Sequence, residues 1–213
     1  YDYQVDAAVA AIFSQLRSQW QSPWELSAGV RAEYTYYDYD NRTGDGSACA
    51  SDASNCRFYR PSDRDHDFTN VAVNAGASYR LDDNTLAYLR VARGFRAPQA
   101  TELYRLQSGQ QTADLDSEEL DNVELGVRGN WAERLSYDGS IYYMQKDQVI
   151  FQDSNRQNIS GAKTRHYGLE LSLDYQLAEH WQLGLDANAS SHSYDSRINL
   201  LGSSGDIKGN DID

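Results

Sequence analysis

Two arginines near a proline are the residues whose type and spacing first suggest ligand chemistry. Arg93 and Arg96 lie in VARGFRAPQATELYRLQ, residues 91–107, and Pro98 follows them. Proline lacks an amide donor, so a strand that reaches this point should end there. The arginines either face an anionic partner or pair with Glu102 and nearby carboxylates to hold the chain in place. We favour the second, structural interpretation.

Other polar clusters carry weaker signals. The stretch RPSDRDHDF places Asp63, Asp65, His66 and Asp67 close together, but their spacing matches no calcium loop. We interpret it as a solvated loop and expect no metal site. His166 and His192 are isolated in the sequence, and we do not expect them to ligate haem or a metal. No catalytic triad, phosphate-binding loop or HExxH motif occurs, so we expect no enzyme and no cofactor.

The two cysteines lie in a polar, loop-like stretch, GDGSACASDASNCRFYRPSD. No histidine or further cysteine stands at a spacing typical of zinc sites. We expect a disulfide between Cys49 and Cys56, formed in an oxidising compartment. The alternative is a pair of unbonded surface thiols.

The composition narrows the class of protein. The chain has 213 residues and a net charge of −13, and an acidic chain of this kind is not expected to bind nucleic acid. Its 16 tyrosines suit surfaces that are apolar on one side and wet on the other. The longest apolar run, residues 7–13, is far shorter than the ~20 residues of a membrane-spanning helix. Strands of a membrane β-barrel alternate and leave only a weak hydropathy signal.

Strict alternation of apolar and polar residues predicts strands. In residues 25–39, the side chains from Leu26 to Tyr36 at even positions are apolar or aromatic, whereas Ser27, Arg31 and Glu33 fall between them. The same pattern occurs in residues 69–81, 121–131 and 166–177, and less cleanly in residues 8–20, 85–93, 137–151 and 182–194. We therefore expect about eight strands.

Strand length and loop length both favour a membrane barrel over a soluble sandwich. A strand of about 14 residues tilted by about 45° covers roughly 33 Å, close to the apolar thickness of a bilayer. Short connections alternate with long ones, as expected of periplasmic turns and external loops. The short connections are 21–25, 81–85, 132–135 and 177–181, and the long ones are 40–66, 94–118, 152–165 and 195–213. The tryptophans at the short turns, as in an aromatic girdle, are Trp20, Trp24, Trp131 and Trp181.

The faces opposite the apolar stripes are polar. They carry Arg31, Glu33, Asn74, Arg90, Glu124, Arg128, Glu170, Asp174 and Asp186. Such residues are costly in a soluble core but normal in a hydrated lumen. A half-exposed soluble sheet would explain the polar face but not the strand length. The sequence therefore predicts an all-β, antiparallel transmembrane β-barrel with short periplasmic turns and long external loops.

A family resemblance rests on the arginine-containing stretch and on three segments C-terminal to it. ARGFRAPQATELY resembles the barrel motif of TonB-dependent outer-membrane receptors, and ADLDSEELDNVELGVRGNW resembles the family's next block. SIYYMQKDQVIF and NISGAKTRHYGLELSLDYQL are similar to the next two strands of the family. The resemblance is specific for residues 67–193 and weaker for residues 1–64.

The resemblance implies a function and a set of partners. It implies active transport across the outer membrane of a Gram-negative bacterium, with a ferric siderophore as the expected ligand and a TonB-type protein that acts through a plug domain. Outer-membrane lipid and lipopolysaccharide are expected neighbours, and the basic cluster KTRHYG, residues 163–168, would attract a ferric chelate or lipopolysaccharide phosphates. The candidates for contact with ligand or plug are Arg93, Arg96, Tyr104, Arg105 and Gln107.

The resemblance also implies that the chain is an excerpt. Family barrels have 22 strands, as in large plugged transporters, so residues 1–213 are expected to form the interior part of one barrel domain, without the plug and the C-terminal strands. An alternative from another class is a complete eight-stranded barrel with a structural or adhesive role. Haem, cobalamin and oligosaccharides are alternative ligands for a receptor of this family.

Overall fold

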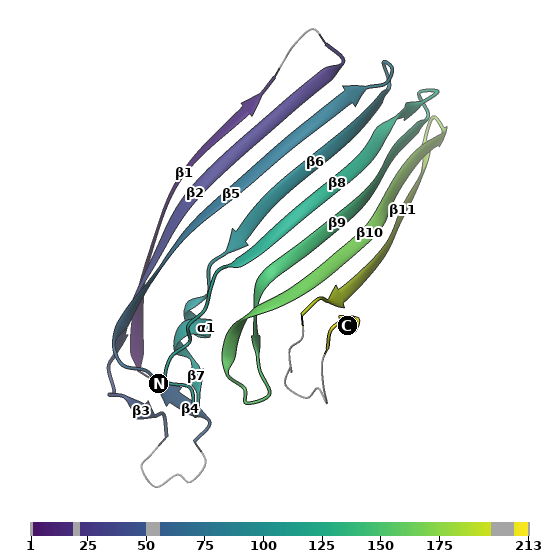
Figure 1. Cartoon of the computed structure of the whole chain (residues 1–213). Helices are drawn as coiled ribbons and strands as arrows, with labels where there is room; N and C mark the ends of the chain where they lie inside the picture. The colour runs from purple at the N-terminus through teal and green to yellow at the C-terminus, as the bar shows by residue number, and fades with distance from the viewer. Residues whose placement is uncertain (1, 19–21, 50–55, 197–206, 213) are drawn as a thin grey trace.

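The structure is a computed structural model that describes residues 2–18, 22–49, 56–196 and 207–212 (Figure 1). Eight long strands form one antiparallel sheet, and each pairs with the next long strand along the chain. Their bounds are β1 (Tyr3–Arg17), β2 (Trp24–Asn41), β5 (Arg64–Arg80), β6 (Thr85–Arg96), β8 (Glu118–Trp131), β9 (Leu135–Gln152), β10 (Asn158–Ala178) and β11 (Trp181–Tyr194). The predicted all-β, antiparallel architecture with eight long strands is confirmed. Among the described residues, no helix is long and apolar enough to cross a membrane.

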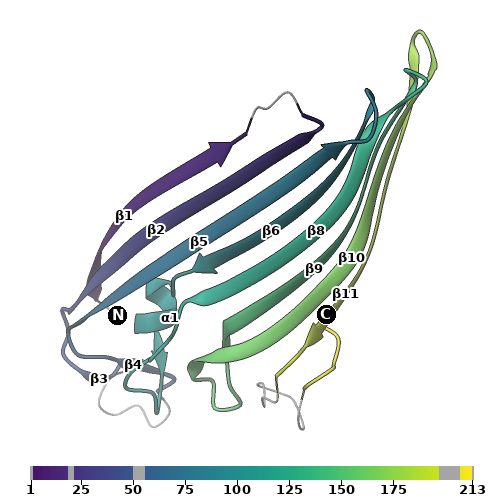
Figure 2. The same cartoon turned by 45° about the horizontal axis from the view of Figure 1, so that its top comes forward.

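The sheet is strongly curved, and its short turns all lie at one end (Figures 1 and 2). Strands β1 and β11 form its two edges, so the part of the chain that the structure describes is an open segment of a barrel wall. The long loops and the remaining small elements lie at the opposite end, which we call the loop end.

One expected loop is mostly strand. Residues 152–165 were expected to be a long connection, but β10 begins at Asn158, which pairs with Gln152. The pairing of β9 with β10 is irregular near Gln148 and Gly161, which both have positive φ, at 55° and 113°. Bulges of this kind let two strands continue with a changed twist, so the hairpin extends past the point where the alternation fades in the sequence.

The two faces of the sheet differ in chemistry. The outer, convex face carries a belt of exposed aliphatic side chains, which includes Leu26, Val71, Leu125, Ile141 and Leu183. Trp24, Trp131 and Trp181 lie on this face at the short turns, and Tyr34, Tyr143 and Tyr167 lie on it nearer the loop end. The two aromatic sets are about ten residues apart along a strand, which at the usual tilt is close to a 25 Å apolar band. Trp20 lies outside the described residues.

The inner, concave face carries the polar residues that the alternation predicted. Cross-strand neighbours run in rows, and one such row contains Arg90 of β6, Glu124 of β8 and Tyr142 of β9. Two glycines of this face make room for large side chains. A Cβ on Gly126 would lie 2.3 Å from the Tyr88 ring, and one on Gly168 would lie 2.8 Å from the Tyr142 hydroxyl. The rings therefore lie flat across the neighbouring strand.

The loop end contains a small hydrophobic core of its own. The loop expected at 94–118 is shorter, because β6 continues to Arg96 and β8 begins at Glu118; residues 97–117 fold back onto the inner face and include helix α1 (Ala100–Tyr104) and strand β7 (Leu106–Gln107). Strand β7 pairs with β4 (Phe58–Arg60), which pairs with β3 (Gly46–Ser47). The buried core consists of Tyr39, Leu103, Tyr104, Leu106, Ala113 and Leu115, and Val5, Tyr37 and Phe68 of the barrel wall pack against it.

Candidate functional site

Arg96 ties the inward-folded loop to the barrel wall. Its Nη1 lies 2.9 Å from Glu102 Oε2 in α1, and its Nε donates to Glu118 Oε2 in β8 at 2.8 Å. Glu118 also accepts a hydrogen bond of 2.8 Å from the amide of Ile150. Glu102 accepts one of 2.7 Å from the amide of Gln99, which completes a capping box at the start of α1. This geometry matches the structural interpretation of Arg96.

These contacts shift the pKa values of the partners. Hydrogen bonds to Glu118 and then to Glu102 raise the pKa of Arg96, so it stays charged. Burial alone would raise the pKa of Glu118, but the hydrogen bonds from Arg96 and from the Ile150 amide outweigh burial and lower it. Both groups are thus charged at neutral pH, and their pairing fixes the point where the chain leaves β6.

Tyr104 is a core residue and not a surface contact. Its side chain is 1% exposed and stacks on Tyr39, with ring centroids 4.5 Å apart. Its hydroxyl lies 3.0 Å from His66 Nδ1, and burial raises the pKa of the hydroxyl. His66 lies on β5 and contacts the loop core through Tyr104, so the stretch expected to be a solvated loop is in part wall strand. A ligand could reach Tyr104 only if the loop opened.

Gln107 and Arg105 differ in accessibility. Gln107 is buried in β7, where its Oε1 accepts a hydrogen bond of 3.3 Å from Arg57 Nε. Arg105 is exposed, and its guanidinium lies 5.1 Å from the centre of the Phe58 ring. Within the described residues, the structure gives Arg105 no salt bridge, and among the candidates Tyr104, Arg105 and Gln107 it is the exposed one. Contact of these residues with ligand or plug stays a prediction.

The side chain of Arg93 lies on the outer face of the sheet, opposite to that of Arg96. The strand register places Arg93 in one row with Val73 and Asp121, on the outer face and away from the lumen where a ligand or plug would lie. Its Nη2 lies 2.6 Å from Asp121 Oδ2. Alternation explains the difference, because Arg93 and Arg96 are an odd number of residues apart and so lie on opposite faces.

The basic cluster at residues 163–168 also has side chains on both faces of the sheet, because neighbouring residues of a strand point in opposite directions. Lys163 and Arg165 form ion pairs near the loop end, with Asp147 at 2.5 Å and Asp195 at 2.7 Å. Arg165 shares its row with Arg93 and therefore faces outward. These cations form a charged rim above the apolar belt, each with an acidic partner.

Cys49 and Cys56 are joined by a disulfide, as predicted. The bond lies beside the short sheet formed by β3, β4 and β7, and the Cys56 sulfur lies 3.3 Å from the carbonyl oxygen of Phe58. It thereby links the chain before and after residues 50–55 close to β4, the strand that pairs with β7.

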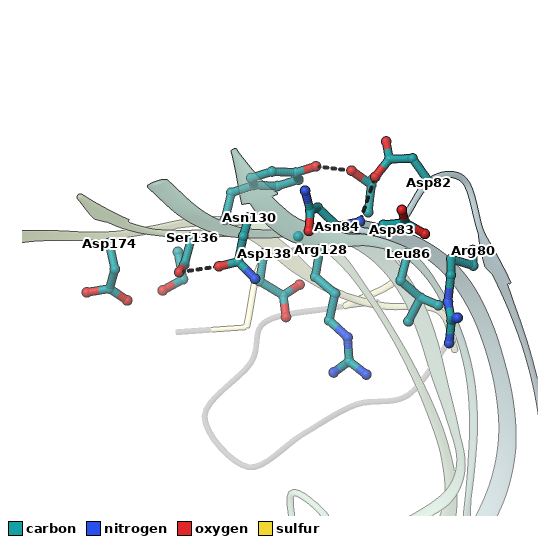
Figure 3. Close-up of a pocket in the computed structure, with 14 residues that line it drawn as sticks. Arg80, Asp82, Asp83, Asn84, Leu86, Arg128, Asn130, Ser136, Asp138 and Asp174 are labelled. Carbon is teal, nitrogen blue, oxygen red and sulfur yellow. Dashed lines mark hydrogen bonds between the residues drawn. The ribbon is translucent and has the colours of Figure 1, made fainter. Parts of the chain in front are cut away.

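A polar pocket lies on the inner face at the short-turn end (Figure 3). Its volume is ≈ 460 Å³, and Asp82, Asp83, Asp138 and Asp174 line it together with Arg80 and Arg128. The β5–β6 turn is held by the Asp82 carboxylate, which accepts a hydrogen bond of 2.8 Å from the Asn84 amide. The pocket can form ion pairs and hydrogen bonds with a polar protein segment, and its residues offer no activated nucleophile for a reaction.

Tyr88 is an inner-face residue that sequence reasoning missed. It is buried, and two guanidiniums lie near its ring centre, that of Arg90 at 4.8 Å and that of Arg128 at 5.9 Å. The sequence could have indicated this position: Tyr88 is two residues before Arg90 and so lies on the same face of the strand, and its cross-strand partner is Gly126, which leaves room for the ring. Arginines stacked on an aromatic ring lose rotamer freedom and present a fixed pattern of donors to the lumen.

An open barrel wall with an apolar outer belt, a polar inner face and an inward-folded loop defines a class of membrane protein. The family described as "TonB dependent receptor-like, beta-barrel" matches residues 1–213, and the chain belongs to it. Members of this family are outer-membrane transporters and receptors of Gram-negative bacteria, not enzymes, and they generally bind siderophores and TonB.

Solved structures of three such proteins share the fold. The copper transporter OprC superposes with a TM-score of 0.73 at 17% identity over 92% of this chain and 31% of its own. The ferric yersiniabactin receptor FyuA of Yersinia pestis gives 0.71 at 19% identity over 96% and 30%. The ferric-catecholate receptor Fiu of E. coli K12 gives 0.72 at 17% identity over 97% and 30%. The chain thus spans about a third of the length of these proteins.

Proposed function

We propose that this chain is part of the barrel domain of an outer-membrane active transporter that imports a ferric siderophore. The observation that carries the proposal is the inward-folded loop of residues 97–117, which packs on the polar inner face and is tied to the wall through Arg96 at the end of β6. Such a loop places side chains over the lumen, where a ligand from outside would arrive, and binding residues often lie on loops held by a rigid scaffold. FyuA and Fiu, whose names specify ferric chelates, support this ligand class.

The remaining barrel is inferred from the sheet edges. In the described structure β1 is paired on one side only, and the second side of β11 is paired only at the loop end, where Ser193 forms a bridge with Asp211. Unpaired backbone groups are not tolerated in lipid, so further strands should pair with both edges. We propose that residues 1–213 belong to one barrel domain of 22 strands. A plug domain would face the polar inner side, including the pocket near Asp138 and Asp174.

The partners are inferred from the same arrangement. A TonB-type protein would supply energy through the plug, and the outer face would contact lipid along the belt and lipopolysaccharide at the charged rim of Arg93, Lys163 and Arg165. We propose no catalytic activity, because the described residues of the inner face offer recognition groups and not a nucleophile with a base.

The test is uptake of iron-55 chelates by cells that carry or lack the gene for the complete protein. We expect the deletion to abolish uptake of one ferric siderophore, and the gene to restore it only in cells with a working TonB-type protein. Haem, cobalamin and oligosaccharide uptake serve as comparison arms. Unchanged chelate uptake in the deletion strain, or uptake that needs no energy coupling, would contradict the proposal.

A further inference from the structure

Two histidines that lie far apart in the sequence face each other on the inner side of the sheet. His166 of β10 and His192 of β11 are direct cross-strand partners, and their Nδ1 atoms are 2.7 Å apart. Met144 of β9, the chain's one methionine, is the direct partner of His166 on its other side. The three side chains line one pocket of ≈ 310 Å³.

The outer nitrogens of the two rings are both held by hydroxyl groups. His166 Nε2 lies 2.8 Å from Thr164 Oγ1, and His192 Nε2 lies 3.0 Å from Ser190 Oγ. When each Nε2 donates its proton to its hydroxyl, each Nδ1 carries a lone pair, and two lone pairs at this distance repel each other. A shared proton or a cation between the rings removes the repulsion. Metal-bound histidines typically donate their second ring nitrogen in this way.

We infer that His166, His192 and Met144 form a binding site for a copper(I) ion in the lumen. Two imidazole nitrogens and a thioether sulfur are soft to borderline ligands, and a thioether selects copper(I) over harder cations. Bonds of about 2.0 Å at a tetrahedral angle would place the two nitrogens ~3.3 Å apart, so a small rotation of each ring admits the ion. Methionine is unbranched and flexible, so its sulfur can adjust to complete the site.

The charges around the pocket agree with a cation. Glu124 and Glu170 line it on the side of the short turns, and Lys146 lines it on the side of the loop end. Glu124 also lies 3.8 Å from the guanidinium of Arg90, so Glu170 is the carboxylate that would face a cation at the two histidines. Among the described residues, no three His, Cys, Asp or Glu side chains are arranged to hold a metal, so the site depends on the methionine as its third ligand.

The experiment is a copper(I) titration of the complete protein in detergent, under reducing conditions, against a colour-forming copper(I) chelator. We expect one bound ion, no tight binding by His192→Gln, and clearly weaker binding by Met144→Leu. Thr164→Val, which removes only the hydroxyl beside His166, should weaken binding about 10- to 100-fold. X-ray absorption of the loaded protein should show nitrogen and sulfur neighbours.

The matched control is His180→Gln, which removes the histidine of the β10–β11 turn at the other end of the sheet. It should bind copper(I) as the unaltered protein does, and circular dichroism should show that each variant is folded. The inference is overturned when the unaltered protein binds no ion, or when folded His192→Gln or Met144→Leu binds it with unchanged affinity. Uptake of iron chelates, measured in parallel, tests the proposed function separately, because a failed titration with intact uptake removes the copper site alone.

Discussion

The loop end and the apolar belt bury apolar side chains in opposite ways. In the loop end, Leu103 is 0% exposed in a core closed by the chain itself, whereas in the belt Ile141 is 58% exposed to its surroundings. A loop in water must form its own core. A strand in a bilayer needs none on its outer face, because lipid covers it. Apolar side chains therefore stabilise both regions, but at the loop end other side chains cover them, whereas on the belt lipid does.

The largest expected effect is on the loop core. Replacing Leu103 with alanine leaves a cavity among Tyr39, Leu106 and Leu115, and such changes cost about 2–5 kcal/mol. We expect the loop of residues 97–117 to open and to become sensitive to protease, while the strands stay protected from hydrogen exchange. Leu89→Ala, in the exposed belt, is the control and should leave the loop intact. An equally protected loop in Leu103→Ala would show that the core does not hold it.

A second prediction tests the belt with two adjacent residues. Ile141 and Ser140 of β9 lie on opposite faces, the first in the belt and the second in the lumen. A lysine near the middle of the bilayer costs about 2–4 kcal/mol on the lipid face. We expect Ile141→Lys to lose that much unfolding free energy in bilayers, and Ser140→Lys to lose little. Similar denaturant midpoints for the two variants would place Ile141 outside lipid.

The third prediction concerns the pH dependence of the loop. The pKa of Glu118 is lower in the closed loop than its ordinary value, because the hydrogen bonds from Arg96 and Ile150 outweigh burial. The stabilisation is therefore complete above about pH 4.3 and is lost as the pH falls through the lower pKa of the closed loop. We expect protease sensitivity of the loop to rise in that acidic range.

The matched variant for this prediction is Glu118→Gln, which cannot ionise. Its loop should be less stable at pH 7 and should change little between pH 7 and pH 3. Leu89→Ala, which keeps Glu118, should still show the acid transition. An identical acid transition in Glu118→Gln would assign it to another carboxylate.

The sequence predicts the apolar belt better than the loop end, and the reason is physical. Alternation fixes the belt, because one face of each strand meets lipid and the other meets water, as from Leu26 to Tyr36. It also implies that Arg93 and Arg96 face opposite ways, although their shared motif suggested one role. The loop end has no such period. Helix α1 and the contact of Tyr104 with His66 depend on packing between distant segments, which propensity alone does not reveal.

The histidine pair illustrates the same limit within the strands. His166 and His192 are isolated in the sequence, and each was interpreted there as a lone side chain without a ligand role. Only the register of β10 with β11 makes them direct partners. Register depends on turn geometry and on every cross-strand pair together, so a site formed across strands is visible only after the sheet is assembled.

The smallest expected effect is that of Arg105→Ala, which tests whether Arg105 contacts the ligand or only stabilises the loop. Its guanidinium stacks on Phe58 without a salt bridge among the described residues, and an exposed stack of this kind contributes about 0.5–1 kcal/mol. If Arg105 contacts an anionic chelate, Arg105→Ala should also weaken ligand affinity by about 0.2–1 kcal/mol, up to roughly fivefold in Kd. Arg105→Lys keeps the charge and should restore most of that affinity. Equal Kd values for Arg105→Ala and the unaltered protein, measured by titration of the complete receptor, would remove Arg105 from the contact candidates and leave it a loop residue like Tyr104.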